Sequence, residues 1–314
     1  MGGEPEKKRS RDLGTILFVL IVAVIIVLAG AVIYVAYTSA REGDSEPYAI
    51  ASGDSVTLNY IGRFSDGRVF DTSILSVAMD DANYTKSLTF NLRSNDSYKP
   101  FEMTAGLYGS GGTIKGFAMG VIGLHVGDYK IVEIPPEDAY PVDSNMLRTV
   151  NITQTVPVKE IYTISTFQSS FSTDPLPLST LSHFFWKWKV LVASVEGDTV
   201  TVLNQPTEGS SVYPFGDPTA ADPYGWEVQV TSYDPAADGG NGIITVQNMI
   251  SADDVYNIKG TDTAGGVFVV SGYDDTNKTF QLHVSNSSAG YNGEIAGRTL
   301  FFEITVISVE PEES

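Results

Sequence analysis

Cysteine and histidine, which often serve in enzyme chemistry, are absent or few in this chain, whereas aromatic side chains are plentiful. Cysteine is absent, which excludes thiol catalysis, disulfides and zinc–cysteine clusters. The three histidines, His125, His183 and His283, are scattered, and no Walker loop, G-x-S-x-G or H-E-x-x-H motif occurs. We therefore predict neither a metal site nor a cofactor. The candidates that remain are aromatic residues and their spacing.

Short motifs that contain aromatic residues follow one another within residues 53–140 and 295–309. They read N-Y-I-G (59–62), D-G-R-V-F-D-T-S (66–73), K-P-F (99–101), T-I-K-G-F (113–117), V-G-D (126–128), I-P-P-E-D-A-Y (134–140) and T-L-F-F-E-I (299–304). Each motif alone is weak, but their common order and spacing are specific. On these residues the chain resembles the FKBP family of peptidyl-prolyl cis–trans isomerases. The large insert after Tyr140 resembles the SlyD-like branch and its longer archaeal relatives.

The resemblance implies an α+β fold, in which a twisted antiparallel sheet is wrapped on a short helix at residues 114–122. It also implies a pocket for the proline side chain. The expected catalytic residues are Tyr60, Asp71 and Tyr140. The expected substrate-binding residues are Phe70, Phe101, Thr113, Ile114, Phe117 and Phe302. Without the family pattern, the same aromatic residues on strands would more often form a simple core.

The implied activity is rotation about X-Pro peptide bonds (rotamase activity), which needs no nucleophile or proton donor. In the family pattern, the Tyr140 hydroxyl and the Ile114 backbone N–H bind substrate carbonyls, and Asp71 orients the surroundings of Tyr60. Two residues depart from the pattern. Phe117 stands where many members have Trp, which bears on the implied binding of macrolide inhibitors, and Pro141 replaces the usual Gly after Tyr140.

The N-terminal part of the sequence predicts a membrane anchor. Residues 13–37 form an apolar run of 25 residues without a charge, long enough to span a bilayer as a helix. The alternative is a cleaved signal peptide, whose apolar stretch is usually shorter, about 7–15 residues. Basic residues precede the run and acidic residues follow it, so we expect a single-pass protein with a cytoplasmic N-terminus and an extracellular C-terminal domain.

The part of the chain that is expected outside the cytoplasm is acidic and contains candidate glycosylation sites. The formal net charge is −19, of which the first twelve residues contribute +1, so nucleic acid is not expected as a partner. Five N-x-S/T sequons are candidate glycosylation sites, although such triplets also arise by chance. They begin at Asn83, Asn95, Asn151, Asn277 and Asn286.

The segments expected along the chain alternate between polar linkers and β-rich regions. They are a cytoplasmic tail (1–12), a transmembrane anchor (13–37), a linker (38–52), the first part of the isomerase domain (53–141), a β-rich insert (142–293) and the closing strand of the isomerase domain (294–310). Residues 73–99 are polar and are expected to form an enlarged loop.

The insert contains an internal repeat. The pattern W-x-V-x-V-x-S at 188–194 recurs at 226–232, and G-x-V-x-V-x-S at 265–271 follows with Gly265 in the Trp position. Each copy precedes a turn and a second strand, which predicts three β-hairpins. A capping box at Ser165 and Gln168 predicts a short helix before them. In SlyD-like proteins the insert binds unfolded clients, and Phe184, Phe185 and Trp186 are the candidates for such contact here. Burial at the edge of the first hairpin is an equally weighted alternative.

The sequence therefore predicts a membrane-anchored prolyl isomerase that acts on unfolded or proline-containing exported proteins, with a client-binding chaperone insert. Two alternatives stay open. One is a non-catalytic cell-surface binding protein on an FKBP-like scaffold, and the other is a structural envelope component.

Overall fold

The computed structural model describes residues 47–217, 219, 224–261 and 265–313. The described chain forms two compact units. Unit 1 contains the residues up to Pro141 and those from Gly297 onward, and unit 2 is Val142–Ala296. The predicted anchor at 13–37 lies outside the described residues. Among the residues that are described, no helix is long and apolar enough to cross a membrane.

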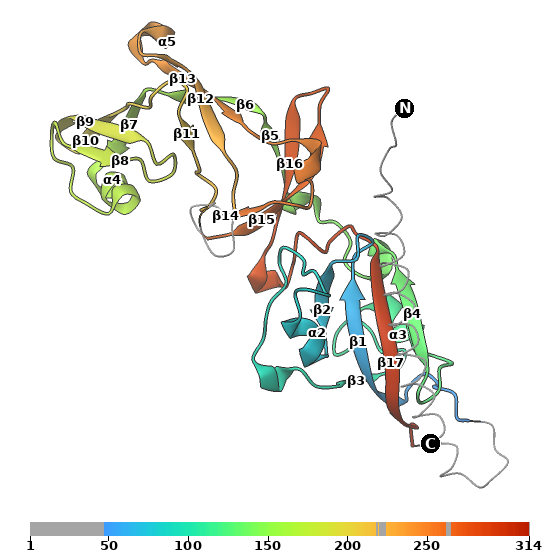
Figure 1. Ribbon diagram of the computed structural model, residues 1–314. Coiled ribbons are helices and arrows are strands. Elements are labelled where there is room, and N and C mark those ends of the chain that lie inside the picture. The colour runs from blue at the N-terminus through green and yellow to red at the C-terminus, as the bar shows by residue number, and fades with distance from the viewer. Residues whose placement is uncertain (1–46, 218, 220–223, 262–264, 314) are drawn as a thin grey trace, which may run out of the picture. The chain divides into compact units, whose positions relative to one another are not determined.

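Unit 1 is built on one antiparallel sheet in the order β2-β1-β17-β4, with β3 also paired to β1. Its strands are β1 (Ser55–Arg63), β2 (Val69–Thr72), β3 (Phe101–Thr104), β4 (Tyr129–Ile134) and β17 (Leu300–Glu310). The last strand of the chain therefore lies in the middle of the sheet. It pairs with β1 along the full length of β1 and with β4 on its other side (Figure 1).

The helix α3 (Lys115–Gly120) covers one face of this sheet and buries Phe117 and Ala118. It lies very close to β4 because it carries glycine at the contact. A Cβ atom on Gly116 would lie 2.2 Å from Ile134 Cγ2, a distance that no side chain could tolerate without a shift. This close approach places Phe117 under the sheet, facing the aromatic residues of β1, β3 and β17.

Residues 73–99 form a folded layer rather than a plain polar loop. The segment contains α2 (Leu75–Met79) and a short 3₁₀ turn at Asn95–Ser97. Val77 of α2 packs with Ile61 and Val69 in a small separate core. The Lys86 ammonium group donates hydrogen bonds to three backbone carbonyls, that of Val77 within this helix and those of Asp80 and Tyr84 after it. Few apolar residues are needed for this layer, which explains why the composition of the segment suggested a loop.

Unit 2 is triplicated, as its sequence predicts, and consists of three four-stranded antiparallel sheets. The first sheet has the order β7-β10-β9-β8, the second β11-β12-β13-β6 and the third β14-β15-β16-β5. The first sheet comprises β7 (Lys159–Thr163), β8 (Thr180–Ser182), β9 (Lys189–Glu196) and β10 (Thr199–Asn204). The second comprises β6 (Thr153–Pro157), β11 (Ser211–Val212), β12 (Val228–Asp234) and β13 (Ile243–Asn248). The third comprises β5 (Leu147–Asn151), β14 (Lys259–Thr261), β15 (Val267–Asp274) and β16 (Thr279–Val284).

Consecutive strands β5, β6 and β7 each join a different sheet, in the reverse order of the hairpins (Figure 1). One stretch of chain therefore ties the three hairpins together. A single apolar core extends across all three sheets, with buried valines from each hairpin. This shared core explains why the unit is repeated, since one hairpin alone could not bury its apolar face.

The strand pairing shows that the third copy of the repeat is shifted by one residue from the position that the sequence predicts. Val190, Val228 and Phe268 hold the same place, because each pairs with the last residue of its partner strand. Gly266, and not Gly265, therefore occupies the position of the two tryptophans. The run of apolar residues from 267 to 270 has no clear alternation, so the sequence alone could not set the phase.

Two hydrogen bonds recur with the repeat. The indole N–H of Trp188 donates to Asn204 Oδ1, and that of Trp226 donates to Asn248 Oδ1, both at 2.8 Å. In the third sheet the position of the asparagine is held by Val284, where no indole is present. The donor and the acceptor are thus absent together, which leaves no buried N–H without a partner there.

The described part of unit 2 also contains two short α-helices and three 3₁₀ turns, at Ser144–Met146, Ala252–Asp254 and Ser287–Ala289. The helix α4 (Ile164–Phe171) buries Phe167 against the first sheet, and α5 (Ala237–Gly240) is a short segment in the β12–β13 hairpin. The capping box of α4 is formed by Thr163 and Thr166 instead of Ser165 and Gln168. The helix begins earlier than expected because β7 ends at Thr163, whose side chain caps the first turn.

Candidate active site in unit 1

Aromatic side chains from four separate strands and one helix meet on the inner face of the unit 1 sheet. Phe302 of β17 lies 5.8 Å from Tyr60 of β1, 5.4 Å from Phe70 of β2 and 4.8 Å from Phe117 of α3, measured between ring centroids. Phe101 of β3 closes the group, with its ring 5.8 Å from that of Tyr60. Most of these contacts are edge to face, the favourable geometry for aromatic rings. We call these five residues the aromatic cup.

Gly62 in β1 is required for this packing. A Cβ atom at that position would lie 2.6 Å from the Phe70 ring and 3.1 Å from the Phe302 ring. The glycine of the N-Y-I-G motif is therefore explained by the close approach of two cup residues to the backbone. Phe70, Phe117 and Phe302 are buried, whereas Tyr60 and Phe101 are partly exposed. The cup is thus accessible from the side on which Tyr60 and Phe101 lie.

Asp71 joins the cup to its polar margin. The Tyr60 hydroxyl donates a 2.6 Å hydrogen bond to Asp71 Oδ2, while Asp71 Oδ1 accepts the Thr72 backbone N–H at 2.8 Å and lies 3.1 Å from the Arg93 guanidinium. Burial, followed by the charge and hydrogen bond of Asp71, raises the pKa of Tyr60 well above its usual value. Tyr60 is therefore protonated at neutral pH and acts as a hydrogen-bond donor.

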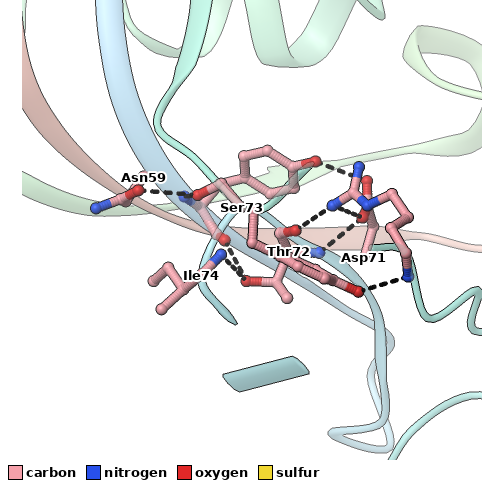
Figure 2. A network of polar contacts seen from close by, with 8 residues as sticks. Asn59, Asp71, Thr72, Ser73 and Ile74 are labelled. Carbon is pink, nitrogen blue, oxygen red and sulfur yellow. Dashed lines mark hydrogen bonds and ion pairs between the residues drawn. The ribbon is translucent and has the colours of Figure 1, made fainter. Parts of the chain in front are cut away.

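The residues after Asp71 fix the two strands against each other (Figure 2). The Ser73 hydroxyl accepts the Tyr60 backbone N–H and donates to Asn59 Oδ1, each at 3.0 Å. The Thr72 hydroxyl donates to the Tyr60 carbonyl and accepts the N–H of Ile74. Thr72 and Ser73 thus bind the backbone of Tyr60 while Asp71 binds its hydroxyl, so the position of the Tyr60 ring is set by this network.

The remaining predicted site residues lie where α3 begins and where unit 1 leads into unit 2. Ile114 is the residue before α3, and no acceptor among the described residues binds its backbone N–H. The Tyr140 side chain as a whole is 41% exposed. Partial loss of water around its hydroxyl, followed by the nearby charge of Asp71, raises the pKa of Tyr140. Thr113 is partly buried beside Ile114. Both Tyr140 and Ile114 therefore offer a hydrogen-bond donor to a ligand.

Comparison with known proteins shows which protein family this domain resembles. Residues 46–156 match the model of the family described as FKBP-type peptidyl-prolyl cis-trans isomerase. The chain carries an FKBP-type domain. The match includes the Tyr60, Asp71, Ile114 and Tyr140 positions and extends into the first strands of unit 2.

Three relatives show how far the likeness extends. The short-type peptidyl-prolyl cis-trans isomerase of Methanocaldococcus jannaschii is 34% identical over 119 residues, which cover 38% of this chain and 64% of that protein. FK506-binding protein 4 of Chaetomium thermophilum is 33% identical over 91 residues, 29% of this chain and 14% of its own. Human peptidyl-prolyl cis-trans isomerase FKBP9 is 31% identical over 97 residues, 31% of this chain and 13% of its own. The chain thus covers less than two thirds of each relative, and each match includes at most 38% of this chain.

The FKBP-type domain also contains a candidate site residue that the sequence did not indicate. Arg93, in the 73–99 segment, forms the ion pair with Asp71 and donates a hydrogen bond to the Thr72 carbonyl. It also lines a pocket of 280 Å³ beside the cup, together with Tyr60, Lys99 and Phe101. No local motif marks Arg93. The structure also shows that the Asp71 side chain is 42% exposed, so burial of this carboxylate gave no signal for a nearby cation.

The candidates for client contact in unit 2 are only partly exposed. Trp186 is 8% exposed and stacks on Trp188 at 4.9 Å between centroids, so it belongs to the core of unit 2 and not to an exposed patch. Phe184 and Phe185 are half-buried. Trp186 is buried because its ring stacks on Trp188 in the segment just before β9. The candidate surface is therefore narrower than the sequence suggested.

The sequons differ in accessibility. Asn83, Asn95, Asn151 and Asn277 are exposed, whereas Asn286 is half-buried and its side-chain oxygen accepts a backbone N–H from Ala289. The side-chain amide of Asn277 donates to Asp274 at 2.7 Å. Whether these residues carry sugars stays a prediction. Within the described residues, no group of three His, Cys, Asp or Glu side chains is placed to hold a metal ion.

Proposed function

We propose that the FKBP-type domain of this chain catalyses rotation about X-Pro peptide bonds. The observation that carries the proposal is the aromatic cup, in which the Tyr60 hydroxyl donates a hydrogen bond to Asp71. Resonance sets a barrier of about 18–20 kcal/mol to amide rotation, while the cis and trans X-Pro forms differ by only about 0.5–1 kcal/mol. The task is therefore to lower a barrier without covalent chemistry.

The cup suits this task in two ways. Its apolar walls hold the proline ring and exclude water, which favours the twisted amide because that amide is less polar than the planar one. The donors at the margin hold the substrate backbone while the bond rotates. Tyr140 and the Ile114 N–H bind substrate carbonyls, and Asp71 keeps the Tyr60 ring in place. Interactions that are stronger in the twisted state than in the planar state accelerate the reaction.

The test is a protease-coupled assay in which the full chain isomerises an Ala-Pro peptide. The wild-type chain should accelerate isomerisation, and Phe70→Ala should reduce the rate well beyond any loss of folded protein, because the cup loses one wall. Circular dichroism controls for folding. Unchanged turnover by a folded Phe70→Ala protein would remove the cup as the active site. A macrolide inhibitor that competes with the peptide would support binding at the same place.

We also propose that the domain works outside the cytoplasm, held by the apolar segment at 13–37. The charge asymmetry across that segment and the four exposed sequons support this location. Protease added to intact cells should then reach the residues beyond Arg41. Cleavage that requires a breached membrane would reverse the proposed orientation.

Unit 2 is proposed to hold unfolded clients beside the isomerase domain, as the insert does in SlyD-like proteins. Its insertion between Tyr140 and β17, both of which belong to the proposed site, supports this role. The main alternative is a non-catalytic cell-surface or envelope protein on an FKBP-like scaffold. The peptide assay separates the two, because only an isomerase accelerates the rotation.

A further inference from the structure

A pocket on unit 2 has walls of aromatic rings around a single carboxylate. The pocket has a volume of about 430 Å³ and lies against β7 of the first sheet. Around Glu160 stand the rings of Tyr162, His183, Phe184, Phe185, Trp186 and Phe215. The rings meet mainly edge to face, with Phe185 4.8 Å from Trp186 and 5.3 Å from Phe215. The Glu160 side chain is 17% exposed, so it can be reached from the pocket.

In the described part of the chain, neither a lysine nor an arginine forms an ion pair with Glu160. Its carboxylate accepts hydrogen bonds from the Tyr162 hydroxyl, from Asn204 Nδ2 at 2.9 Å and from His183 Nε2 at 3.4 Å. The Nδ1 atom of His183 accepts the backbone N–H groups of Phe185 and Trp186, both at 3.1 Å, so Nε2 is the ring nitrogen that donates to Glu160. Among the described residues, His183 is the one basic side chain within 4.0 Å of Glu160.

The same contacts keep Glu160 ionised. Burial alone would raise its pKa, but the hydrogen bonds from His183, Tyr162 and Asn204, with a smaller electrostatic contribution from His183, outweigh burial and lower it below the usual value. A carboxylate that is mostly withdrawn from water is costly unless a cation joins it. The faces of the surrounding rings are also negative and attract cations. Both features of the pocket therefore favour a positively charged ligand.

The carboxylate is specific to the first sheet, which argues against a role in folding the repeat. The strand register places Gln154 of β6 and Arg148 of β5 at the positions that correspond to Glu160. Each faces the same hairpin position in its own sheet, yet neither is acidic. The three sheets share their fold without sharing this charge, so the repeat does not need it.

We propose that this pocket binds the lysine or arginine side chain of an unfolded client polypeptide, with its cationic group against Glu160. The inference deepens the client-holding role proposed above and rests on it. A polypeptide is favoured over a free amine because the half-buried Phe184 and Phe185 extend the contact to apolar neighbours of the basic residue. Residues 142–296 carry 17 acidic and 6 basic side chains, which draws basic segments toward the unit.

The test measures how the full chain binds short, proline-free, dye-labelled peptides by fluorescence anisotropy. The peptides are apolar and differ at one central residue, which is lysine, norleucine or glutamate. The lysine peptide should bind about tenfold more tightly than the norleucine peptide, the factor expected for a partly desolvated cation among aromatic rings. Glu160→Gln should remove this difference. Phe185→Leu, which keeps the volume but not the ring, should reduce it.

Ile161→Thr is the matched control. Ile161 is the next residue of β7, is 64% exposed and points away from the pocket, and threonine is the residue at the corresponding positions of β5 and β6. It should leave all three affinities unchanged. All three tryptophans of the chain belong to unit 2, so tryptophan fluorescence reports whether each variant is folded.

Three outcomes would overturn the proposal. Equal binding of the lysine and norleucine peptides by the wild-type chain would do so without any variant, even if Glu160→Gln failed to fold. A lysine preference that survives in folded Glu160→Gln would place the cation elsewhere. If none of the peptides binds, the client-holding role fails together with this inference. None of these results bears on the isomerase site, because the peptides contain no proline.

Discussion

Asp71 is held by residues from two distant parts of the chain, and each contributes a different element of the site. Tyr60, on the neighbouring strand, belongs to the N-Y-I-G motif, which can be recognised in the sequence. Arg93 comes from the 73–99 segment, whose polar composition suggested only a loop. The family pattern therefore predicted Asp71 and Tyr60 as site residues. It did not predict Arg93, the cation that pairs with Asp71, because the two residues are brought together only by the fold.

Arg93→Leu tests this arrangement. Without the guanidinium, Asp71 keeps an unbalanced charge at the margin of the cup and Thr72 loses a donor to its carbonyl. We expect kcat/KM for an Ala-Pro peptide to fall about three- to tenfold, a loss of roughly 1 kcal/mol of transition-state stabilisation. Lys99→Leu is the control, since Lys99 lines the same pocket without an ion pair to Asp71. Equal effects of the two substitutions would show that only the pocket's overall charge matters.

The two tyrosines of the site predict a pH profile. The pKa values of Tyr60 and Tyr140 are both raised above the usual 10.0, so both hydroxyls stay protonated as the pH rises through the range in which an ordinary tyrosine begins to ionise. We expect kcat/KM to stay constant from neutral pH to about pH 9, as measured on protein whose circular dichroism is unchanged. A fall with a midpoint below about pH 10 would mean that one of these hydroxyls is not shielded as described.

At the scale of elements, the alternation of apolar residues and the order of the motifs predicted which segments form strands and hairpins. They did not predict the register of the third hairpin or the residues that cap α4. The strands of unit 1 and the three hairpins of unit 2 followed from period-two patterns and turn signals. The third hairpin was misplaced by one residue because Val267–Val270 is apolar throughout, and β pairing sets the phase there. The cap of α4 was misplaced because β7 runs directly into the helix, a junction that depends on pairing with β10.

The recurring Trp–Asn pairs predict an uneven response to substitution in unit 2. Asn248→Leu leaves the buried Trp226 indole N–H without its acceptor, and such a group costs about 1–3 kcal/mol. The free energy of unfolding of unit 2 should fall by that amount in urea titrations followed by tryptophan fluorescence. Gln247→Leu, at the adjacent half-exposed position, should change it little. A similar loss in both variants would show that the indole hydrogen bond is not what stabilises the pair.

At the scale of the whole molecule, the chain leaves and re-enters unit 1 at two residues that touch. The Gly297 N–H donates a 2.9 Å hydrogen bond to the Tyr140 carbonyl, so both ends of unit 2 meet next to a residue of the proposed site. The sequence predicted an insert ending at residue 293, and the structure places the end at Ala296. The geometry of the junction could not be read from the sequence, because residues 140 and 297 are brought together only by the fold.

This junction predicts that the two functions separate. Replacing residues 143–291 with a short Gly/Ser linker should leave isomerisation of a tetrapeptide largely intact, because the cup lies entirely in unit 1. Catalysis of proline-limited protein refolding should become much slower, since a tethered client site raises the local client concentration to roughly millimolar. Equal refolding catalysis by the two proteins would rule out client holding by unit 2.

The central claim is that the aromatic cup lowers the barrier to X-Pro rotation, and exchange NMR of an Ala-Pro peptide tests it without a coupled protease. Cis and trans proline signals of the free peptide do not exchange on the NMR timescale, because the uncatalysed rotation takes tens to hundreds of seconds. With a catalytic amount of the wild-type chain, exchange cross-peaks should appear, and they should be strongly reduced with Phe302→Leu. The absence of exchange with folded wild-type protein would contradict the claim and leave the FKBP-type domain as a binding scaffold.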